Sequence, residues 1–163
     1  MDCAIDIKHY LPHRPPMLMV DMIHRMDEQV VETSFEIKPD NIFAAGGVFA
    51  EAGLIENAAQ TCSSIVAKGY FVDEHNQDKP DVDVIGFISA IKSMKVHALP
   101  KTGSTITTKA VLVSKFVTET YSLCTMDCKT FDGEILLLDG EINLFIQEQS
   151  REMAAKSEVS GQA

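Results

Sequence analysis

Two residues with the potential for chemistry, Glu56 and Gln60, lie four positions apart in a stretch otherwise rich in alanine, leucine and isoleucine. Four residues are about one turn of an α-helix, so both side chains are expected on one face and within hydrogen-bonding reach. A carboxylate there can transfer protons if burial strengthens it, because a free glutamate, with an ordinary pKa of about 4.3, is a weak base at pH 7. From spacing alone, the alternative is the solvated face of an amphipathic helix.

The helix that would carry this pair is predicted from about Glu51 to Lys68, where apolar residues recur at three- and four-residue spacing. Apolar positions cover more than half of its circumference, and Gly69 is expected to cap its C-terminal end. The remaining positions form a narrow polar stripe that comprises Glu56, Gln60, Ser63 and Ser64.

Most of the remaining chain is predicted to be β-structure. Residues 5–11 indicate a short helix, residues 17–27 and 29–37 a strand pair, and residues 39–50 a loop. Four long strands are expected over residues 82–96, 104–117, 118–131 and 133–146, joined as a meander with a hairpin turn at Asp132-Gly133. Gly140 inside the last strand indicates a bulge or a bend rather than a strand end.

These elements together predict an α+β hot-dog fold, in which a curled antiparallel sheet wraps a long central helix. A helix that is apolar over most of its circumference cannot leave half of its surface in water, so the sheet must curl around it. The chain has 163 residues, which is enough for one core. Residues 1–147 are therefore expected to form one hot-dog domain, and residues 148–163 a flexible tail.

Composition excludes several classes of partner. The formal net charge is −10 at pH 7, which repels nucleic acid and anionic membrane surfaces at long range. No apolar run approaches the ~20 residues of a membrane-spanning helix, and the N-terminus does not resemble a secretory signal, so we expect a cytoplasmic protein. The cysteines show no metal-binding spacing. We therefore expect no metal or cofactor, and reduced core thiols at Cys62, Cys124 and Cys128.

Three segments resemble the 3-hydroxyacyl-[acyl-carrier-protein] dehydratases, which have the hot-dog fold. The stretch "YLPHRPPMLMVDMI" resembles their opening, in which Leu-Pro-His-Arg precedes an apolar run and Val-Asp. The stretch "LIENAAQT" is similar to their central helix, and "IGFISAIKSMKVHALPKTGSTI" is similar to the strand and turn that follow it. The resemblance runs in one register from about residue 5 to residue 146.

The resemblance implies roles for particular residues. Glu56 corresponds to the acid of the family's central helix, and the amide region near Gly53 to the backbone donors that polarise the thioester carbonyl. Gln60 and Gly47 are expected to contact the substrate, although Gly46-Gly47 equally fits a simple turn. The family uses a basic segment to receive its acidic carrier protein, and its equivalents here are Lys92, Lys95 and Lys101. Solvated lysines at a strand edge are the alternative.

The family's catalytic histidine has no equivalent in this chain. Family members carry it in a Gly-His-Phe-Pro segment before the central helix, whereas the matching segment here, "NIFAAGGVFAEAG", contains no histidine. Ungapped counting places Ile42 at that position, and pairing the glycines places Gly47 there. The shortened segment is similar to the divergent dehydratase-like proteins of aryl polyene pathways. His13 is expected to be structural, at the turn after the first helix.

Three functions follow as hypotheses. The first is a homodimer, or a higher even oligomer, that acts as a divergent dehydratase on 3-hydroxyacyl groups in fatty-acid or polyene-type synthesis. Its substrate would be a thioester of acyl carrier protein or coenzyme A, carried on phosphopantetheine. The second is a catalytically silent acyl-binding subunit that forms a heteromer with an active dehydratase. The third is a hot-dog thioesterase, in which a helix carboxylate activates water.

Overall fold

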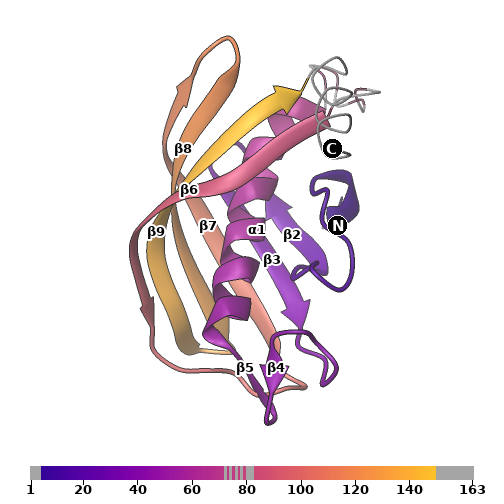
Figure 1. The fold of residues 1–163 in the computed structure, drawn as a ribbon, viewed down its shortest axis with the longest axis vertical. Helices are drawn as coiled ribbons and strands as arrows, with labels where there is room; N and C mark the ends of the chain where they lie inside the picture. The colour runs from indigo at the N-terminus through magenta and orange to yellow at the C-terminus, as the bar shows by residue number, and fades with distance from the viewer. Residues whose placement is uncertain are drawn as a thin grey trace, which may run out of the picture.

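The computed structural model describes residues 5–149, except residues 72, 74, 76, 78 and 80–82. Within these residues one long helix packs against a curled antiparallel sheet of seven strands, as the α+β hot-dog prediction requires (Figure 1). The elements are β1 (Ile5–Asp6), a 3₁₀ turn η1 (Ile7–His9), β2 (Met22–Met26), β3 (Val30–Glu36), β4 (Ala44–Ala45), β5 (Val48–Phe49), α1 (Glu51–Phe71), β6 (Asp83–Val96), β7 (Thr105–Val117), β8 (Tyr121–Asp132) and β9 (Ile135–Gln149).

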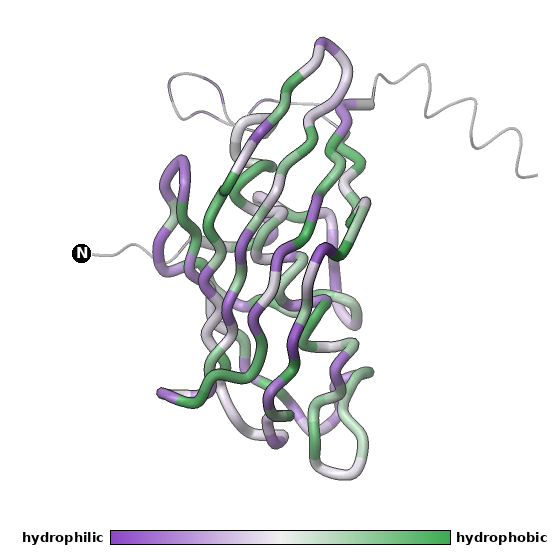
Figure 2. Tube along the Cα trace, turned by 90° about the vertical axis from the view of Figure 1, so that its left-hand side faces the viewer, coloured by the Kyte–Doolittle hydropathy of each residue, from purple (hydrophilic) through white to green (hydrophobic). Residues whose placement is uncertain are grey.

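Alternating side chains give the sheet one face toward the helix. Along β8, Cys124, Met126 and Cys128 are buried, whereas the residues between them are half-buried. This is the period-two pattern of a strand with one covered face. Hydrophobic and hydrophilic residues alternate in the same way along the long strands (Figure 2). The inward-facing residues of β3, β7, β8 and β9 and the buried face of α1 therefore form one core.

The helix α1 is buried on more than its apolar face. Leu54, Ala58 and Cys62 have no exposed surface, and the polar residues Asn57 and Thr61 are at most 1% exposed. The helix begins at Glu51, as predicted, and the carbonyl of the preceding residue accepts the first amide hydrogen bonds. The predicted end at Gly69 is wrong, because the helix continues to Phe71 and has no positive φ at that glycine.

The sheet order differs from a simple meander. Strands β7, β8 and β9 are consecutive neighbours, but β6 pairs with β9 and β7 pairs with β3, giving the order β1-β2-β3-β7-β8-β9-β6. Strand β6 is therefore an edge strand of the described sheet (Figure 1). The short helix predicted at residues 5–11 is only a three-residue 3₁₀ turn between β1 and β2. The predicted tail lies almost entirely outside the described residues.

The cysteine prediction is confirmed where the structure describes it. Cys62, Cys124 and Cys128 are free and buried, and Cys3 lies outside the described residues. The hydrogen bond with the Cys128 thiol, together with burial, raises the pKa of the Cys62 thiol well above its ordinary value. These thiols consequently behave as small apolar residues between α1 and β8.

Gly140 allows two strands to approach closely. Strand β9 continues through it, and the irregularity lies in the facing strand β6, between Ile91 and Ser93. A Cβ atom at Gly140 would lie 2.8 Å from Met94 Sδ and 3.0 Å from Met94 Cα, and closer still to the Ser93 carbonyl oxygen. Since backbone atoms make up part of this contact, the neighbours cannot yield by a side-chain rotation alone.

Gly140→Ala is expected to destabilise the protein by about 1–3 kcal/mol, because the added methyl group overpacks a fixed backbone contact. Gly86→Ala is the matched control in the neighbouring strand, where an added Cβ would meet Ile146 Cγ1 at an ordinary 3.6 Å. Urea unfolding of both variants measures the difference. Equal stability of the two alanine variants would contradict the close-approach explanation.

Candidate active site

The candidate site is centred on the side chains of Glu56 and Gln60, one turn apart on α1. The Gln60 Nε2 donates a hydrogen bond to Glu56 Oε1 at 2.8 Å, so the predicted contact is confirmed. The same Nε2 donates to the Met17 carbonyl at 2.8 Å, and Gln60 Oε1 accepts from the Met19 amide at 2.8 Å. The glutamine therefore joins the helix, the carboxylate and the loop before β2 in one network.

The alternative of a solvated helix face is wrong for Gln60, which is only 1% exposed. The Glu56 side chain is 26% exposed, so its carboxylate lies at the border of the core rather than in open solvent. Among the residues that the structure describes, its partners all lie on Oε1. No contact to the second carboxylate oxygen, Oε2, is seen among these residues.

The sequence did not predict that the His13 ring lies beside Glu56. Its Nε2 lies 3.8 Å from Glu56 Oε1, although the two residues are 43 positions apart. The Nδ1 atom of the same ring is buried and has no hydrogen-bond partner among the described residues. His13 lies in the turn after η1, where the sequence placed it, but its ring points to the candidate site. No sequence pattern tied His13 to Glu56, because the loop before β2 brings the two residues together only in the folded chain.

Gly53 lies at the start of α1, where the first amides of the helix are free of intrahelical partners. Its own amide donates to the Ala50 carbonyl at 3.0 Å. A substrate carbonyl would therefore be a second acceptor for this amide. A Cβ at Gly53 would lie 2.8 Å from Phe43 Cβ and would also overlap the Phe49 ring. Close aromatic packing explains the glycine at this position.

Gly46 and Gly47 form the turn between β4 and β5, at the end of the molecule where α1 begins (Figure 1). Their φ angles are +61° and +77°, which L-residues with side chains rarely adopt, so the turn explains both glycines. The Gly47 carbonyl accepts a hydrogen bond from the Thr102 amide at 3.0 Å. The hairpin tip is thereby fixed to the β6–β7 connection, and its surface is exposed.

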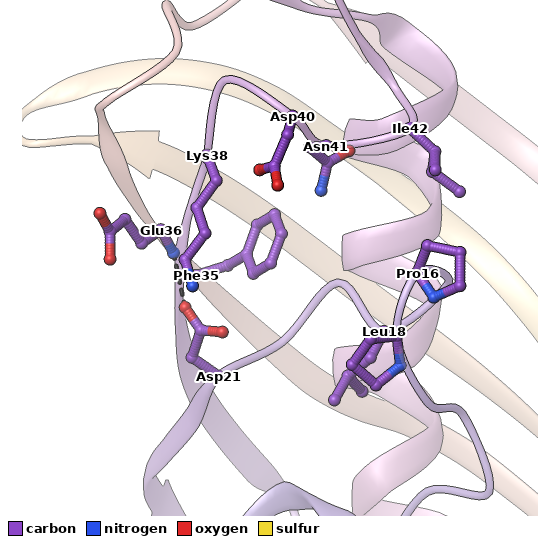
Figure 3. Close-up of a pocket in the computed structure, with 10 residues that line it drawn as sticks. Pro16, Leu18, Asp21, Phe35, Glu36, Lys38, Asp40, Asn41 and Ile42 are labelled. Atoms are coloured by element: carbon purple, nitrogen blue, oxygen red, sulfur yellow. Dashed lines mark hydrogen bonds between the residues drawn. The ribbon is translucent and has the colours of Figure 1, made fainter.

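A hollow of about 300 Å³ lies on the side of the molecule where the Pro15–Leu18 loop meets residues 38–42. Pro16 and Ile42 lie at one end of it, and Asp21 and Glu36 lie at the other (Figure 3). Ile42 occupies the family's histidine position by ungapped counting and is 49% exposed. Its side chain has no group that can transfer a proton. Glu56 is not among the lining residues of this hollow.

The three lysines predicted to meet a carrier protein lie in two places. Lys92 and Lys95 belong to the edge strand β6, and both are exposed. Lys92 Nζ forms an ion pair with Glu141 Oε1 at 2.6 Å, and Lys95 lies opposite Asp139 in the strand ladder. Lys101 lies on the β6–β7 connection, where it bridges to β5. Lys92 and Lys95 therefore each lie beside an acidic residue of β9, which offsets part of their positive charge.

No group of three or more histidine, cysteine, aspartate or glutamate side chains in the described part of the chain is arranged to hold a metal ion. Within the same residues, no helix is both long enough and apolar enough to span a membrane.

Comparison with known proteins identifies a family of dehydratases. Residues 5–155 match the model of the ApeP-like family, described as ApeP dehydratase. This match covers most of the chain. It agrees with the similarity of the shortened glycine segment to the divergent dehydratase-like proteins. A comparison with curated protein sequences found no match.

Solved structures share the fold at low sequence identity. A chain of the dehydratase heterocomplex ApeI:P from Xenorhabdus doucetiae superimposes with a TM-score of 0.72 at 15% identity, covering 93% of this chain and 96% of that chain. The virulence protein Cj0977 from Campylobacter jejuni gives 0.59 at 14% identity, with coverages of 82% and 79%. A hypothetical thioesterase with coenzyme A from Streptococcus pneumoniae gives 0.54 at 16% identity, with coverages of 78% and 85%.

Gln60→Leu is expected to destabilise the protein by about 2–4 kcal/mol, because it leaves the Met19 amide and the Met17 carbonyl without their partner. Ser63→Ala is the control on the same helix. The Ser63 hydroxyl donates to the Ala59 carbonyl, within one turn of α1, and its loss should change stability by less than about 0.5 kcal/mol. Urea unfolding measures both. A Gln60→Leu variant as stable as the parent would show that the network does not hold the loop.

Proposed function

Because this chain belongs to the ApeP-like dehydratase family, we propose that it takes part, in the cytoplasm, in dehydrating 3-hydroxyacyl thioesters for fatty-acid or polyene-type synthesis. In this reaction the Cα–H and Cβ–O bonds break, a Cα=Cβ double bond forms, and the hydroxyl group leaves as water. A base must take the α-proton, an acid must protonate the hydroxyl group, and donors must stabilise the enolate oxygen.

The observation that carries this proposal is the hydrogen bond between Gln60 and Glu56. Since Gln60 donates to Oε1, a proton on the Glu56 carboxyl group is favoured on Oε2. Oε2 is then the atom that exchanges protons with the substrate, and Gln60 fixes the plane of the carboxylate. Gly53 lies three residues before Glu56, in the first turn of α1. Its amide and the neighbouring amides at the start of the helix supply the donors for the thioester carbonyl.

We further propose that the active form is a heteromer in which a second hot-dog subunit supplies a histidine. Two copies of this chain would not supply one from the matching segment, because residues 39–50 contain no histidine. The fold is shared with a chain of a dehydratase heterocomplex. The edge strand β6 offers a surface for such a subunit, since its backbone is unpaired on one side in the described chain and Phe87 and Ile91 are about half exposed.

Glu56→Gln is expected to abolish formation of the 2-enoyl thioester while the protein remains folded, because the amide keeps the shape but transfers no proton. The loss should reach at least about 10²-fold. The assay supplies a 3-hydroxyacyl-carrier thioester to the chain alone and to an equimolar mixture with a histidine-bearing hot-dog dehydratase. Mass spectrometry of the acyl group detects the product.

Glu51→Gln is the matched control, since it makes the same chemical change at an exposed position of the same helix. It should retain the parent rate. Equal turnover by Glu56→Gln and the parent, alone and in the mixture, would exclude Glu56 as a catalytic residue and leave a silent subunit. Release of free acid would instead identify a thioesterase. Activity of the chain alone would favour the homodimer over the heteromer.

We propose that the substrate arrives on an acyl carrier protein that approaches the side of β6. Lys92 and Lys95 lie there, and Lys101 lies on the connection that follows β6. The net charge of the chain is −10, so an acidic carrier is repelled at long range and requires local cations at the contact. The ion pair between Lys92 and Glu141 would have to open or extend to the carrier.

Lys92→Glu combined with Lys95→Glu is expected to weaken carrier binding about tenfold, and added salt should weaken binding to the parent, because exposed charges are screened. Lys109→Glu combined with Lys115→Glu is the matched control, since it changes the net charge equally and reverses lysines of β7. Titration calorimetry at two salt concentrations measures both effects. Equal weakening by the two double variants would place the docking surface elsewhere.

A further inference from the structure

The His13 ring lies beside the candidate catalytic carboxylate, in a loop that several hydrogen bonds hold in place. The Arg14 guanidinium donates to the carbonyls of Leu11 and His13, both at 2.8 Å. On the far side of the loop, the Met17 carbonyl accepts from Gln60. Because the loop is fixed before and after His13, the ring stands near Glu56 as part of the packed structure rather than as a mobile surface side chain.

The two ring nitrogens of His13 have different surroundings. Nε2 faces Glu56 Oε1 at 3.8 Å, whereas Nδ1 is buried without a partner among the described residues. An N–H group on Nδ1 would be buried without an acceptor, whereas an N–H group on Nε2 points to a carboxylate. Of the two tautomers of the imidazole ring, the surroundings therefore favour the one that carries its proton on Nε2.

We propose that His13 is a positioning residue that, together with Gln60, directs N–H groups at Oε1 of Glu56. This inference rests on the proposed function of Glu56. The distance of 3.8 Å exceeds a hydrogen bond, and a shift of about 1 Å between the ring and the carboxylate completes the contact when substrate binds. With two donors on Oε1, the proton that Glu56 exchanges with substrate is confined to Oε2.

Kinetics of three variants test the role of the ring, in the assembly in which the parent is active. The glutamine side chain places its amide nitrogen near the position of Nε2, whereas asparagine places it near Nδ1. We expect His13→Ala and His13→Asn to lower kcat about 10- to 100-fold with KM changed less than about threefold, and His13→Gln to stay within about threefold of the parent. Thermal unfolding of each variant confirms that it is folded.

Two kinetic results would overturn the proposal. A parent-level kcat in His13→Asn would make His13 merely structural. A His13→Gln variant as slow as His13→Asn would show that the imidazole itself transfers protons rather than orienting Glu56. If His13→Ala does not fold, the comparison of the asparagine and glutamine variants still decides between these outcomes.

A spectroscopic measurement separates this inference from the proposed function. In ¹⁵N-labelled protein the ring resonances of His13, identified by their loss in His13→Gln among the five histidines, should report the Nε2–H tautomer. Glu56→Gln should shift its Nε2 resonance, and Glu51→Gln should not. An Nδ1–H tautomer, or no shift in Glu56→Gln, would overturn the positioning role. If the expected shift occurs in a protein without dehydratase activity, His13 still orients Glu56 and only the assigned reaction fails.

Discussion

The architecture of the site depends on the buried side-chain amide of Gln60. A primary amide offers two N–H donors and a carbonyl oxygen that accepts two hydrogen bonds. Gln60 uses both donors, toward the Met17 carbonyl and Glu56, and its oxygen accepts from the Met19 amide. Without Gln60, the fully buried Met19 amide would lose its hydrogen-bond partner. The loop before β2 and the carboxylate are therefore positioned by one group, so the fold and the site share a single constraint.

The same principle governs the rest of the helix. Asn57 donates to the Met19 carbonyl at 2.6 Å and accepts from the Thr108 hydroxyl at 2.6 Å, and Thr108 in turn contacts Thr130 at 2.8 Å. Asn57, Gln60 and Thr61 of α1 thus have hydrogen-bond partners in the sheet or in the loop before β2. Fully satisfied polar networks of this kind fix one arrangement of a core, because a shifted register would leave several groups unpaired.

The spacing of apolar residues predicted the helix and the strands, but not which elements pack against each of them. It located α1, the strand pair β2–β3 and the four long strands, because these depend on local patterns of apolar residues. It could not place β6 beside β9, since strand neighbours are chosen by pairing between distant segments. It also assigned Gln60 to a polar stripe without showing whether water or protein covers that stripe. Residue type and spacing singled out Glu56 and the resemblance supplied its expected role, whereas the position of His13 required the loop geometry.

The chemistry of the proposed dehydration gives a reason why a chain with a single candidate carboxylate would need a second subunit. One carboxylate can take the α-proton and later return it to the departing hydroxyl group, so the proton balance closes with Glu56 alone. It cannot be base and acid at the same moment, however, and elimination must then pass through an enolate. The amide of Gly53, a candidate donor to that enolate, already bonds to Ala50. A histidine from another subunit would let proton removal and hydroxyl departure overlap, which lowers the demand on those donors.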